Sequence, residues 1–156
     1  MIAIGAMSEN RCIGNKGKLP WAPIKEDFRW FRELTLNKRL LVGRKTYDSF
    51  GRGFLPKRHI LVASNGESWM RADTTIEDWY IVSCGKVTIN EIPEEVIVGG
   101  GSKIYEFFLP RITEFYITHV SGEYEGDTFM PPFEHLLPTV TSIKEFDGHH
   151  VVKYSR

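Results

Sequence analysis

The sequence has little cysteine and no excess charge of either sign. Only Cys12 and Cys84 occur among its 156 residues, too few for a disulfide framework, and no Cys/His spacing suggests a metal site. The 20 Lys and Arg residues equal the 20 Asp and Glu residues, so net charge favours neither nucleic acid nor an anionic membrane. These absences predict a protein of a reducing compartment, and we expect the cytoplasm.

Long apolar runs are also absent. The sequence has no stretch of about 18 apolar residues, so it does not predict a membrane span. Residues 1–7 are apolar without a basic leader before them, which indicates a buried strand and not a signal peptide. A chain of 156 residues, 42% of them hydrophobic, fits one domain with a sizeable core. We therefore expect a single domain over residues 1–156.

Short apolar runs alternate with helical patterns along the chain. We predict strands at residues 2–7, 40–43, 60–63, 96–98 and 115–120. We predict four helices. The first ends at residues 34–36, near Asn37, and the second runs from 44 or 45 to 50. The third is capped by Thr75 and closed by Gly85, and the fourth covers 102–109. Residues 65–75 are polar and predict a surface loop, while Asp147-Gly148 between apolar runs predicts a terminal hairpin. The pattern indicates an α/β fold with a mostly parallel sheet covered on both faces.

Asp27 is the most informative candidate for a functional residue. It begins an apolar helical stripe that continues through Phe28, Phe31 and Leu34. A carboxylate beside inward-facing aromatic rings is costly unless a ligand or a side chain pairs with it. The alternative is an ordinary acid at a helix start, where the helix dipole favours it.

Two further segments have the composition of anion-binding turns. Gly43-Arg44-Lys45-Thr46 follows a predicted strand, where a helix start would bind phosphate, although an exposed basic loop is equally compatible with it. The segment Val98 to Tyr105 contains three consecutive glycines but fits neither the dinucleotide-binding fingerprint nor the Walker loop of nucleoside triphosphatases. A tight structural turn is its alternative.

Residues 14–19 suggest a mobile loop that acts as a lid, or else a simple connection.

Taken together, the motifs of residues 1–154 resemble the dihydrofolate reductase family. Chance could supply one such motif, but not ten in order along the chain. The motifs are Ile4-Gly5-Ala6, Arg11-Cys12-Ile13-Gly14, Leu19-Pro20-Trp21, Asp27-Phe28-Arg29-Trp30-Phe31, Gly43-Arg44-Lys45-Thr46-Tyr47, Ser49-Phe50-Gly51-Arg52, Leu55-Pro56-Lys57-Arg58, Gly100-Gly101-Ser102-Lys103-Ile104-Tyr105, Tyr116-Ile117-Thr118 and Glu125-Gly126-Asp127-Thr128.

The resemblance implies a single-domain α/β fold with an eight-stranded, mostly parallel sheet, flanking helices and a C-terminal antiparallel hairpin. It implies hydride transfer from NADPH to dihydrofolate by a cytoplasmic monomer. Asp27 would bind the pterin and support its protonation, with Trp21 holding a water and Leu19 closing the lid. The residues expected to bind substrate are Ile4, Ala6, Asp27, Phe28, Phe31, Arg32, Arg52, Arg58 and Thr118.

On the cofactor side, the resemblance implies a phosphate-binding turn and a glycine pair joined by a cis peptide. Ser64 would reach the adenosine phosphate. The residues expected to bind NADPH are Ala6, Ile13, Gly14, Gly43, Arg44, Lys45, Thr46, Ser64, Gly100, Gly101, Ser102, Lys103, Ile104 and Tyr105.

The chain departs from the family pattern at several positions. The family's glycine before the tail-binding arginine is missing, so Lys57 competes with Arg58 for that role. Gly99 stands where the family has a branched apolar residue, Arg39 stands where it often has proline, and residues 65–95 match poorly. Two other functions remain open: a non-catalytic binder of folate or nucleotide, and the related reductase domain of riboflavin synthesis. The latter is not expected to carry Asp27 in an aromatic stripe after Pro20-Trp21.

Overall fold

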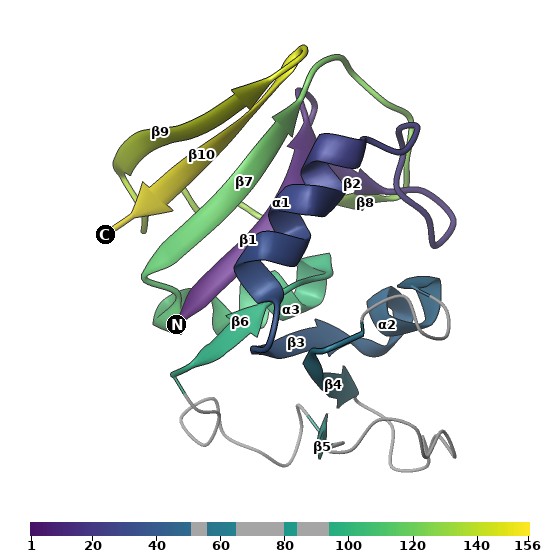
Figure 1. Cartoon of the computed structure of the whole chain (residues 1–156), viewed down its shortest axis with the longest axis vertical. Helices are drawn as coiled ribbons and strands as arrows, with labels where there is room; N and C mark the ends of the chain where they lie inside the picture. Colours follow the sequence, from purple (N-terminus) through teal and green to yellow (C-terminus); the bar gives the residue numbers. More distant parts are fainter. Residues whose placement is uncertain (51–55, 65–79, 84–93) are drawn as a thin grey trace.

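A twisted eight-stranded sheet forms the centre of the computed structural model, which describes residues 1–50, 56–64, 80–83 and 94–156 (Figure 1). The strands lie in the order β5-β4-β3-β6-β1-β7-β10-β9. Five neighbouring pairs from β5 to β7 are parallel, and β10 pairs antiparallel with both β7 and β9. The predicted mostly parallel sheet with a terminal hairpin is confirmed. The strands are β1 (Ile2–Ser8), β3 (Arg39–Gly43), β4 (His59–Ser64), β5 (Tyr80–Ser83), β6 (Val96–Val98), β7 (Glu114–Val120), β9 (Thr139–Phe146) and β10 (His149–Ser155).

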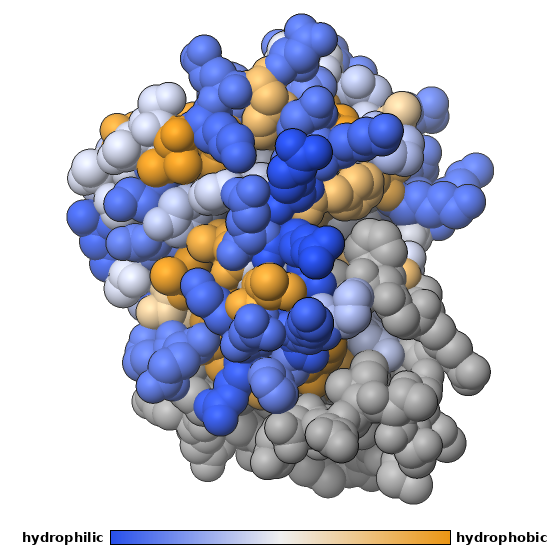
Figure 2. All heavy atoms as spheres, in the orientation of Figure 1, coloured by the Kyte–Doolittle hydropathy of each residue, from blue (hydrophilic) through white to orange (hydrophobic). Residues whose placement is uncertain are grey.

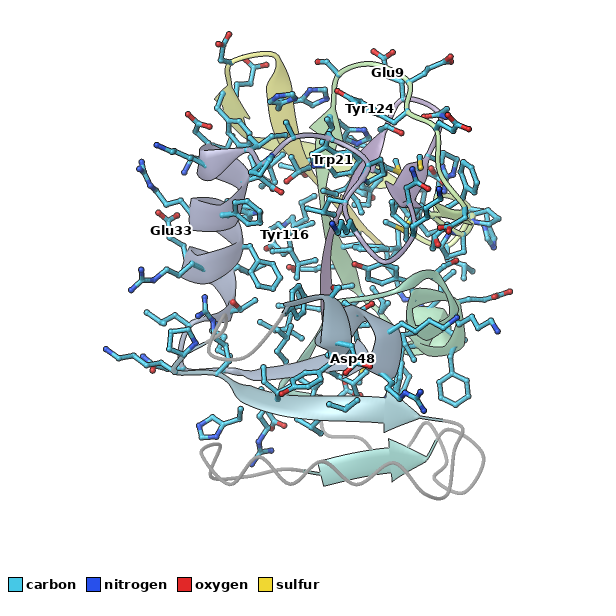
Figure 3. The ribbon with its side chains drawn as sticks, turned by 90° about the vertical axis from the view of Figure 1, so that its right-hand side faces the viewer. Glu9, Trp21, Glu33, Asp48, Tyr116 and Tyr124 are labelled. Atoms are coloured by element: carbon cyan, nitrogen blue, oxygen red, sulfur yellow. The ribbon has the colours of Figure 1, made fainter. Side chains whose placement is uncertain are left out.

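Helices cover both faces of this sheet. Helix α1 (Lys25–Thr35) lies across one face, and α3 (Ser102–Phe108) lies on the other, with α2 (Arg44–Phe50) beyond the end of β3 (Figures 1 and 3). The α3 face packs around Phe108, Phe115 and Phe133, which are fully buried. The α1 face packs around Leu40, Val42 and Ile97, against which Phe31 and Leu34 of α1 close. Burial of such side chains contributes roughly 1.5–3 kcal/mol each.

Helix α1 has no side-chain cap at its amino end. Its N-cap is Ile24, and Glu26 and Asp27 in the first turn are the acids that the helix dipole favours there. The helix ends where the backbone N–H of Leu36 bonds to the carbonyl of Arg32. Because packing, more than capping, holds most helices in proteins, the apolar stripe fixes which way Asp27 points.

A second, two-stranded sheet joins β2 (Cys12–Gly14) to β8 (Thr128–Phe129). The segment 14–19 starts at the last residue of β2 and forms a tight turn, because Asn15 and Lys18 exchange backbone hydrogen bonds of 2.8 and 3.1 Å. Lys16 and Gly17 at its tip both have positive φ, 50° and 78°, as a two-residue hairpin turn requires. This small sheet was not predicted, because strands of three and two residues carry too little pattern.

Two elements differ from the prediction. Residues 80–83 form β5, parallel to β4, whereas a helix was expected there. The local cap signal at Thr75 lies outside the described residues, and pairing with β4 decides the conformation of Tyr80–Ser83. Helix α3 ends at Phe108, and a short 3-10 helix, η2 (Leu109–Arg111), continues the chain through Pro110. The predicted loop at 65–75 lies outside the described residues.

Polar side chains cover most of the face seen in Figure 2, and apolar residues form small separate patches on it. Within the described ranges, none of the helices combines the length and the apolar character that a bilayer crossing needs. The hairpin edge of the sheet is exposed along β9.

Candidate active site

Most of the predicted site residues gather beyond the carboxyl ends of the parallel strands, whereas Arg58 directly precedes β4 at its amino end. Ala6 near the end of β1 pairs with Thr118 of β7, and Gly43 ends β3 beside Gly100, which follows β6. This edge is where open α/β sheets bind their ligands. A cavity of about 660 Å³ lies at the opposite edge, among the first residues of β1, β3, β4 and β6, so it is not part of this site.

Asp27 is held by a short hydrogen bond from the sheet. The hydroxyl Oγ1 of Thr118 donates to Oδ1 of Asp27 across 2.6 Å. Thr118 is fully buried, and Asp27 is half-buried. Within the described ranges no lysine or arginine lies within ion-pair distance of this carboxylate. One carboxylate oxygen therefore remains available for a ligand that donates hydrogen bonds.

Burial raises the pKa of Asp27 above its usual value. The hydrogen bond from Thr118, and then the charge of His149, act in the opposite direction and lower the pKa, but burial outweighs them. A carboxyl group with a raised pKa exchanges protons nearer to neutral pH than an exposed one. Such perturbed groups are characteristic of functional sites.

Tyr105 lies against the backbone of β1 on the neighbouring side of the site. Its hydroxyl donates a 2.7 Å hydrogen bond to the carbonyl of Ile4. Burial, and then the charge of Asp27, raise the pKa of Tyr105 far above its usual value, so it stays neutral. A Cβ atom on Gly5 or Gly100 would lie 2.7 or 2.9 Å from this hydroxyl. Both glycines are therefore needed for the tyrosine to occupy this position.

The glycine pair joins β6 to α3 and has the predicted cis peptide between Gly100 and Gly101. The backbone N–H of Gly43 bonds to the Gly100 carbonyl across 2.8 Å, which places the start of α2 beside the pair. A Cβ atom on Gly101 would lie 3.2 Å from the hydroxyl of Thr46. Arg44 and Lys45 are exposed here, and Arg44 lies 4.0 Å from Asp48. Ser102, Lys103 and Ile104 continue from the pair into α3.

Arg58 is buried at the other end of α1. Its Nε donates to the hydroxyl of Thr35 across 3.1 Å, and its Nη1 donates to the carbonyl of Pro56 across 2.8 Å. Burial, and then the charge of Arg32, lower the pKa of the guanidinium. Only 7% of Arg58 is exposed, yet no carboxylate of the described chain pairs with it. The side chain of the preceding residue, Lys57, lies in solvent, and its backbone has a positive φ of 61°.

Aromatic rings lie between these two charged ends. Phe31 packs against Phe50 of α2 with ring centres 6.4 Å apart. Phe28, with 36% of its surface exposed, stands beside Asp27 at the same end of the helix. Ile4 is buried in the floor beneath α1. These side chains form apolar walls of the kind that a flat ligand requires.

The loop between β7 and β8 holds the turn at residues 14–19 in place. The backbone N–H of Lys16 donates to Oδ2 of Asp127 across 3.1 Å, and the N–H of Asp127 donates to the Gly14 carbonyl across 3.0 Å. Trp21 is buried edge-on against Tyr124, at 5.8 Å between ring centres, and both are labelled in Figure 3. Leu19, in contrast, is 44% exposed. Ile13 lies in β2, next to Gly14.

Some predicted residues lie apart from this arrangement or outside the described ranges. Arg52 is outside them, and of Ser64 only its place at the end of β4 is described. Arg32 is exposed and near Arg58, not Asp27. The described part of the chain contains no cluster of three or more metal-ligating side chains. The contacts of Thr35 and Asp127 with site residues, and the electrostatic effect of His149 on Asp27, were not predicted, because nothing local in the sequence marks a partner that comes from another element.

Comparison with known proteins agrees with this geometry. A sequence model described as dihydrofolate reductase matches residues 1–154. A dihydrofolate reductase of Enterococcus faecium is 36% identical over 129 residues, covering 83% of this chain and 76% of the relative. One of Bacillus subtilis is 33% identical over 131 residues, covering 84% and 75%. The solved dihydrofolate reductase from Enterococcus faecalis complexed with NADP(H) and RAB-propyl has a TM-score of 0.79 and 26% identity, covering 99% of this chain and 95% of its own.

The fold and the carboxylate at the edge of the sheet thus define an α/β protein that binds small molecules beyond its strand ends. More particularly, the chain belongs to the dihydrofolate reductase family.

Proposed function

We propose that this protein transfers a hydride from NADPH to 7,8-dihydrofolate and releases 5,6,7,8-tetrahydrofolate. The observation that carries the proposal is the half-buried carboxylate of Asp27, which has Thr118 as its partner and no lysine or arginine of the described ranges at ion-pair distance. A pterin supplies what is missing, because its amino group and ring nitrogen donate two hydrogen bonds to a carboxylate. Charge-assisted bonds of this kind are about twice as strong as neutral ones.

Asp27 and Arg58 lie at opposite ends of α1, and the distance between them supports a long substrate. Asp27 and Thr35, the partner of Arg58, are eight residues apart on the helix, which corresponds to about 12 Å along its axis. A ligand with a cationic ring at one end and a carboxylate at the other matches this spacing. Phe31 and Phe28 would contact its middle, while Ile4 and Ala6 would form the floor under the ring.

Arg58 would bind the α-carboxylate of the glutamate tail. Its buried guanidinium keeps donors that neither Thr35 nor Pro56 uses, and a carboxylate accepts two parallel bonds from such a group. Lys57 is the poorer candidate, because its side chain lies in solvent. Arg32 and Arg52 would border the same tail.

NADPH, when bound, supplies the hydride. The residues of the chain fit it in two places, since Gly100 and Gly101 allow its diphosphate to approach the backbone, and the start of α2 offers Arg44, Lys45 and Thr46 to its phosphates. Tyr105, Ala6, Ile13 and Gly14 would surround the nicotinamide, with Gly43, Ser102, Lys103 and Ile104 behind them and Ser64 towards the adenosine. Because Asp27 acts electrostatically on Tyr105, the substrate and cofactor sides adjoin each other.

The role of Asp27 in the reaction is to favour protonation of the pterin. Hydride reduction of the imine requires a proton on its nitrogen, and a nearby carboxylate stabilises that cationic form. Burial raises the pKa of Asp27, so the group holds a proton at a higher pH than an exposed carboxyl group does. Trp21 would position a water near the pterin, and Leu19 would cover the site.

Mixing the purified protein with NADPH and dihydrofolate, and following nicotinamide absorbance, tests the proposal. Steady oxidation that needs both compounds supports it. Binding of both compounds without oxidation would instead indicate a non-catalytic binder, and no response to dihydrofolate in a folded sample would contradict the proposal. A pyrimidine precursor of riboflavin in place of dihydrofolate tests the related reductase function.

We also infer that the chain acts as a single-domain monomer in the cytoplasm, without nucleic acid or membrane partners. One continuous sheet links residues 2–155, and formal charge is balanced across the sequence. Light scattering at micromolar concentration tests the oligomeric state. A stable dimer would contradict this inference and leave the proposed reaction untouched.

A further inference from the structure

His119 and His150 form a stacked pair of imidazoles on the face of the sheet opposite to Asp27. The two residues pair directly across β7 and β10. Their ring centres are 5.0 Å apart, and their planes meet at 13°. Thr118, which precedes His119 in β7, directs its hydroxyl to Asp27 on the α1 face, so the side chain of His119 lies on the α3 face. The sheet therefore separates the two imidazoles from the proposed reaction.

The imidazole of His119 is half-buried and is held through one of its nitrogens. Its Nε2 lies 2.9 Å from the hydroxyl of Tyr154, which belongs to β10. The ring of Tyr154 is itself fixed, because it packs edge-on against Phe133 with ring centres 4.9 Å apart. When Nε2 carries the proton and donates it to this hydroxyl, Nδ1 of His119 presents a free lone pair. A histidine that binds a metal ion through one nitrogen commonly donates the N–H of the other in this way.

His150 is exposed beside a small pocket. In the described part of the chain, neither of its ring nitrogens has a hydrogen-bond partner, so the ring can turn about its Cβ–Cγ bond, a torsion with broad preferences. The pocket has a volume of about 100 Å³, which is room for roughly three water molecules. Its lining consists of Glu9, His119, Val120, Ser121 and His150. Glu9, labelled in Figure 3, brings a carboxylate, and none of these lining residues is a lysine or an arginine that would repel a cation.

The spacing of the two rings suits a shared metal ion. Zinc–nitrogen bonds of about 2.0–2.1 Å place the centres of two imidazoles on one tetrahedral ion roughly 5 Å apart, and the observed separation is 5.0 Å. In the parallel stack the lone pairs lie in parallel planes. A turn of the exposed His150 ring, which leaves its centre in place, lets them converge on one ion without movement of the strands. Two imidazoles with water as the remaining ligands suit Zn²⁺, Cu²⁺ or Ni²⁺, whereas Mg²⁺ and Ca²⁺ prefer oxygen ligands.

We propose that His119 and His150 form a binding site for one divalent transition-metal ion of the zinc class, at the carboxyl end of β7. Nδ1 of His119 and one ring nitrogen of His150 bind the ion, and the hydroxyl of Tyr154 accepts the N–H of the other nitrogen of His119. The ion links the terminal hairpin to the parallel part of the sheet and stabilises this junction. The site is independent of the proposed reductase reaction, because Asp27 lies on the other face of the sheet.

Calorimetric titration of the protein, without a histidine tag, with Zn²⁺ tests the site. One ion should bind per chain, and Mg²⁺ in excess should not compete. His150→Gln should weaken binding roughly tenfold or more, and because the side chain is exposed the variant should fold normally. His149→Gln is the matched control, since it removes an adjacent imidazole from the other face of β10, and should bind zinc like the wild type. Equal affinity in the wild type and His150→Gln, or no saturable binding up to about 1 mM zinc, would overturn the proposal.

Nitrogen-15 NMR of the imidazoles identifies the ligating atoms. Zinc should shift Nδ1 of His119 and a nitrogen of His150, while Nε2 of His119 keeps its proton. Tyr154→Phe, which keeps the ring and removes the acceptor, should weaken binding roughly tenfold. Urea unfolding should show that zinc stabilises the wild type and not His150→Gln, because the ion binds only the folded pair. Zinc-induced shifts confined to other residues would overturn the proposal. Reductase turnover enters none of these measurements, so failure of the proposed reaction would leave the metal site intact.

Discussion

Thr118 donates a 2.6 Å hydrogen bond to Asp27 from a position 91 residues further along the chain. This bond links the first turn of α1 to the central strand β7, and it opposes the effect of burial on the carboxyl group. Because the hydroxyl favours the ionised form, it sets how readily Asp27 takes up a proton.

Thr118→Val should therefore raise the pKa of Asp27 further and move the pH midpoint of kcat/KM upward. Loss of the buried hydroxyl should also cost about 1–3 kcal/mol of unfolding free energy at neutral pH, and less in acid, where the carboxyl group is protonated. Urea unfolding and activity measured across pH check both effects. Thr118→Ser keeps the donor and is the control, and a Val variant with the wild-type midpoint would argue against the bond's influence.

Asp27→Asn should lower activity most at neutral pH and less in acid, where dihydrofolate can arrive already protonated. The same substitution should stabilise the fold at neutral pH. The folded-state pKa of Asp27 lies above its unfolded value, so the folded state binds more protons and is favoured as the pH falls through that folded pKa. Above it, ionised Asp27 opposes folding, and an amide does not. Urea midpoints measured across pH should show a gain at neutral pH that shrinks as the pH falls through the folded-state pKa of Asp27. Equal activity losses at every pH would remove Asp27 from the protonation step.

Arg58→Ala should raise KM for dihydrofolate by roughly 10- to 100-fold and change kcat little. The charged bonds to the tail are made equally in ground and transition states. Steady-state kinetics with saturating NADPH measure the effect. Lys57→Ala serves as control with an unchanged KM, and the opposite result would transfer the tail-binding role to Lys57.

Lys57→Gly should stabilise the protein by about 0.5–1 kcal/mol. Lys57 has a φ of 61°, a left-handed conformation that costs a residue with a side chain roughly 1–2 kcal/mol. Glycine avoids this cost, but it loses more conformational entropy on folding, so the net gain is smaller. Chemical denaturation measures the gain. Lys57→Ala retains the Cβ atom and should show none, so an equal gain from both variants would refute backbone strain as the cause.

Gly99→Ala should destabilise the fold by about 1–3 kcal/mol, because the added Cβ atom would lie 2.8 Å from Cδ1 of Leu40 and 3.1 Å from Cγ1 of Val42. Both side chains are fully buried. Shortening the first neighbour with Leu40→Val should relieve part of the clash, so the double variant should lose less than the sum of the two single losses. A double-mutant cycle of unfolding free energies checks this, and strict additivity would exclude the contact.

The sequence predicted the elements whose pattern is local. Apolar runs such as residues 40–43 and 115–120 identified strands, and the Asp147-Gly148 turn identified the terminal hairpin. Residues 80–83 were assigned wrongly, because pairing with β4 is a contact between distant segments that no local cap signal reports. The same limit explains why β2 and β8 were missed: Cys12 pairs with Phe129 across more than a hundred residues.

In the functional site, too, the sequence predicted the local motifs but not the contacts between distant segments. Family motifs placed Asp27 at the start of α1 and the glycine pair before α3, and the cis peptide expected there is present. The motifs could not choose between Lys57 and Arg58, whereas burial and the bond to Thr35 distinguish them. Nor could they indicate the electrostatic effect of His149 on Asp27, since β10 comes beside β7 only when the sheet forms.

Strand β1 has a consequence for the synthesis of the chain. It lies between β6 and β7, with Ile2 paired to both Ile97 and Glu114. Both neighbours are translated about a hundred residues later, which at ribosomal speeds of 5–20 residues per second means a delay of roughly 5–20 s. Throughout that interval Ile2, Ile4 and Met7 belong to an apolar segment without partners. Strand β1 thus waits for about a hundred further residues, and during that time it is a natural target for chaperones that shield nascent apolar segments.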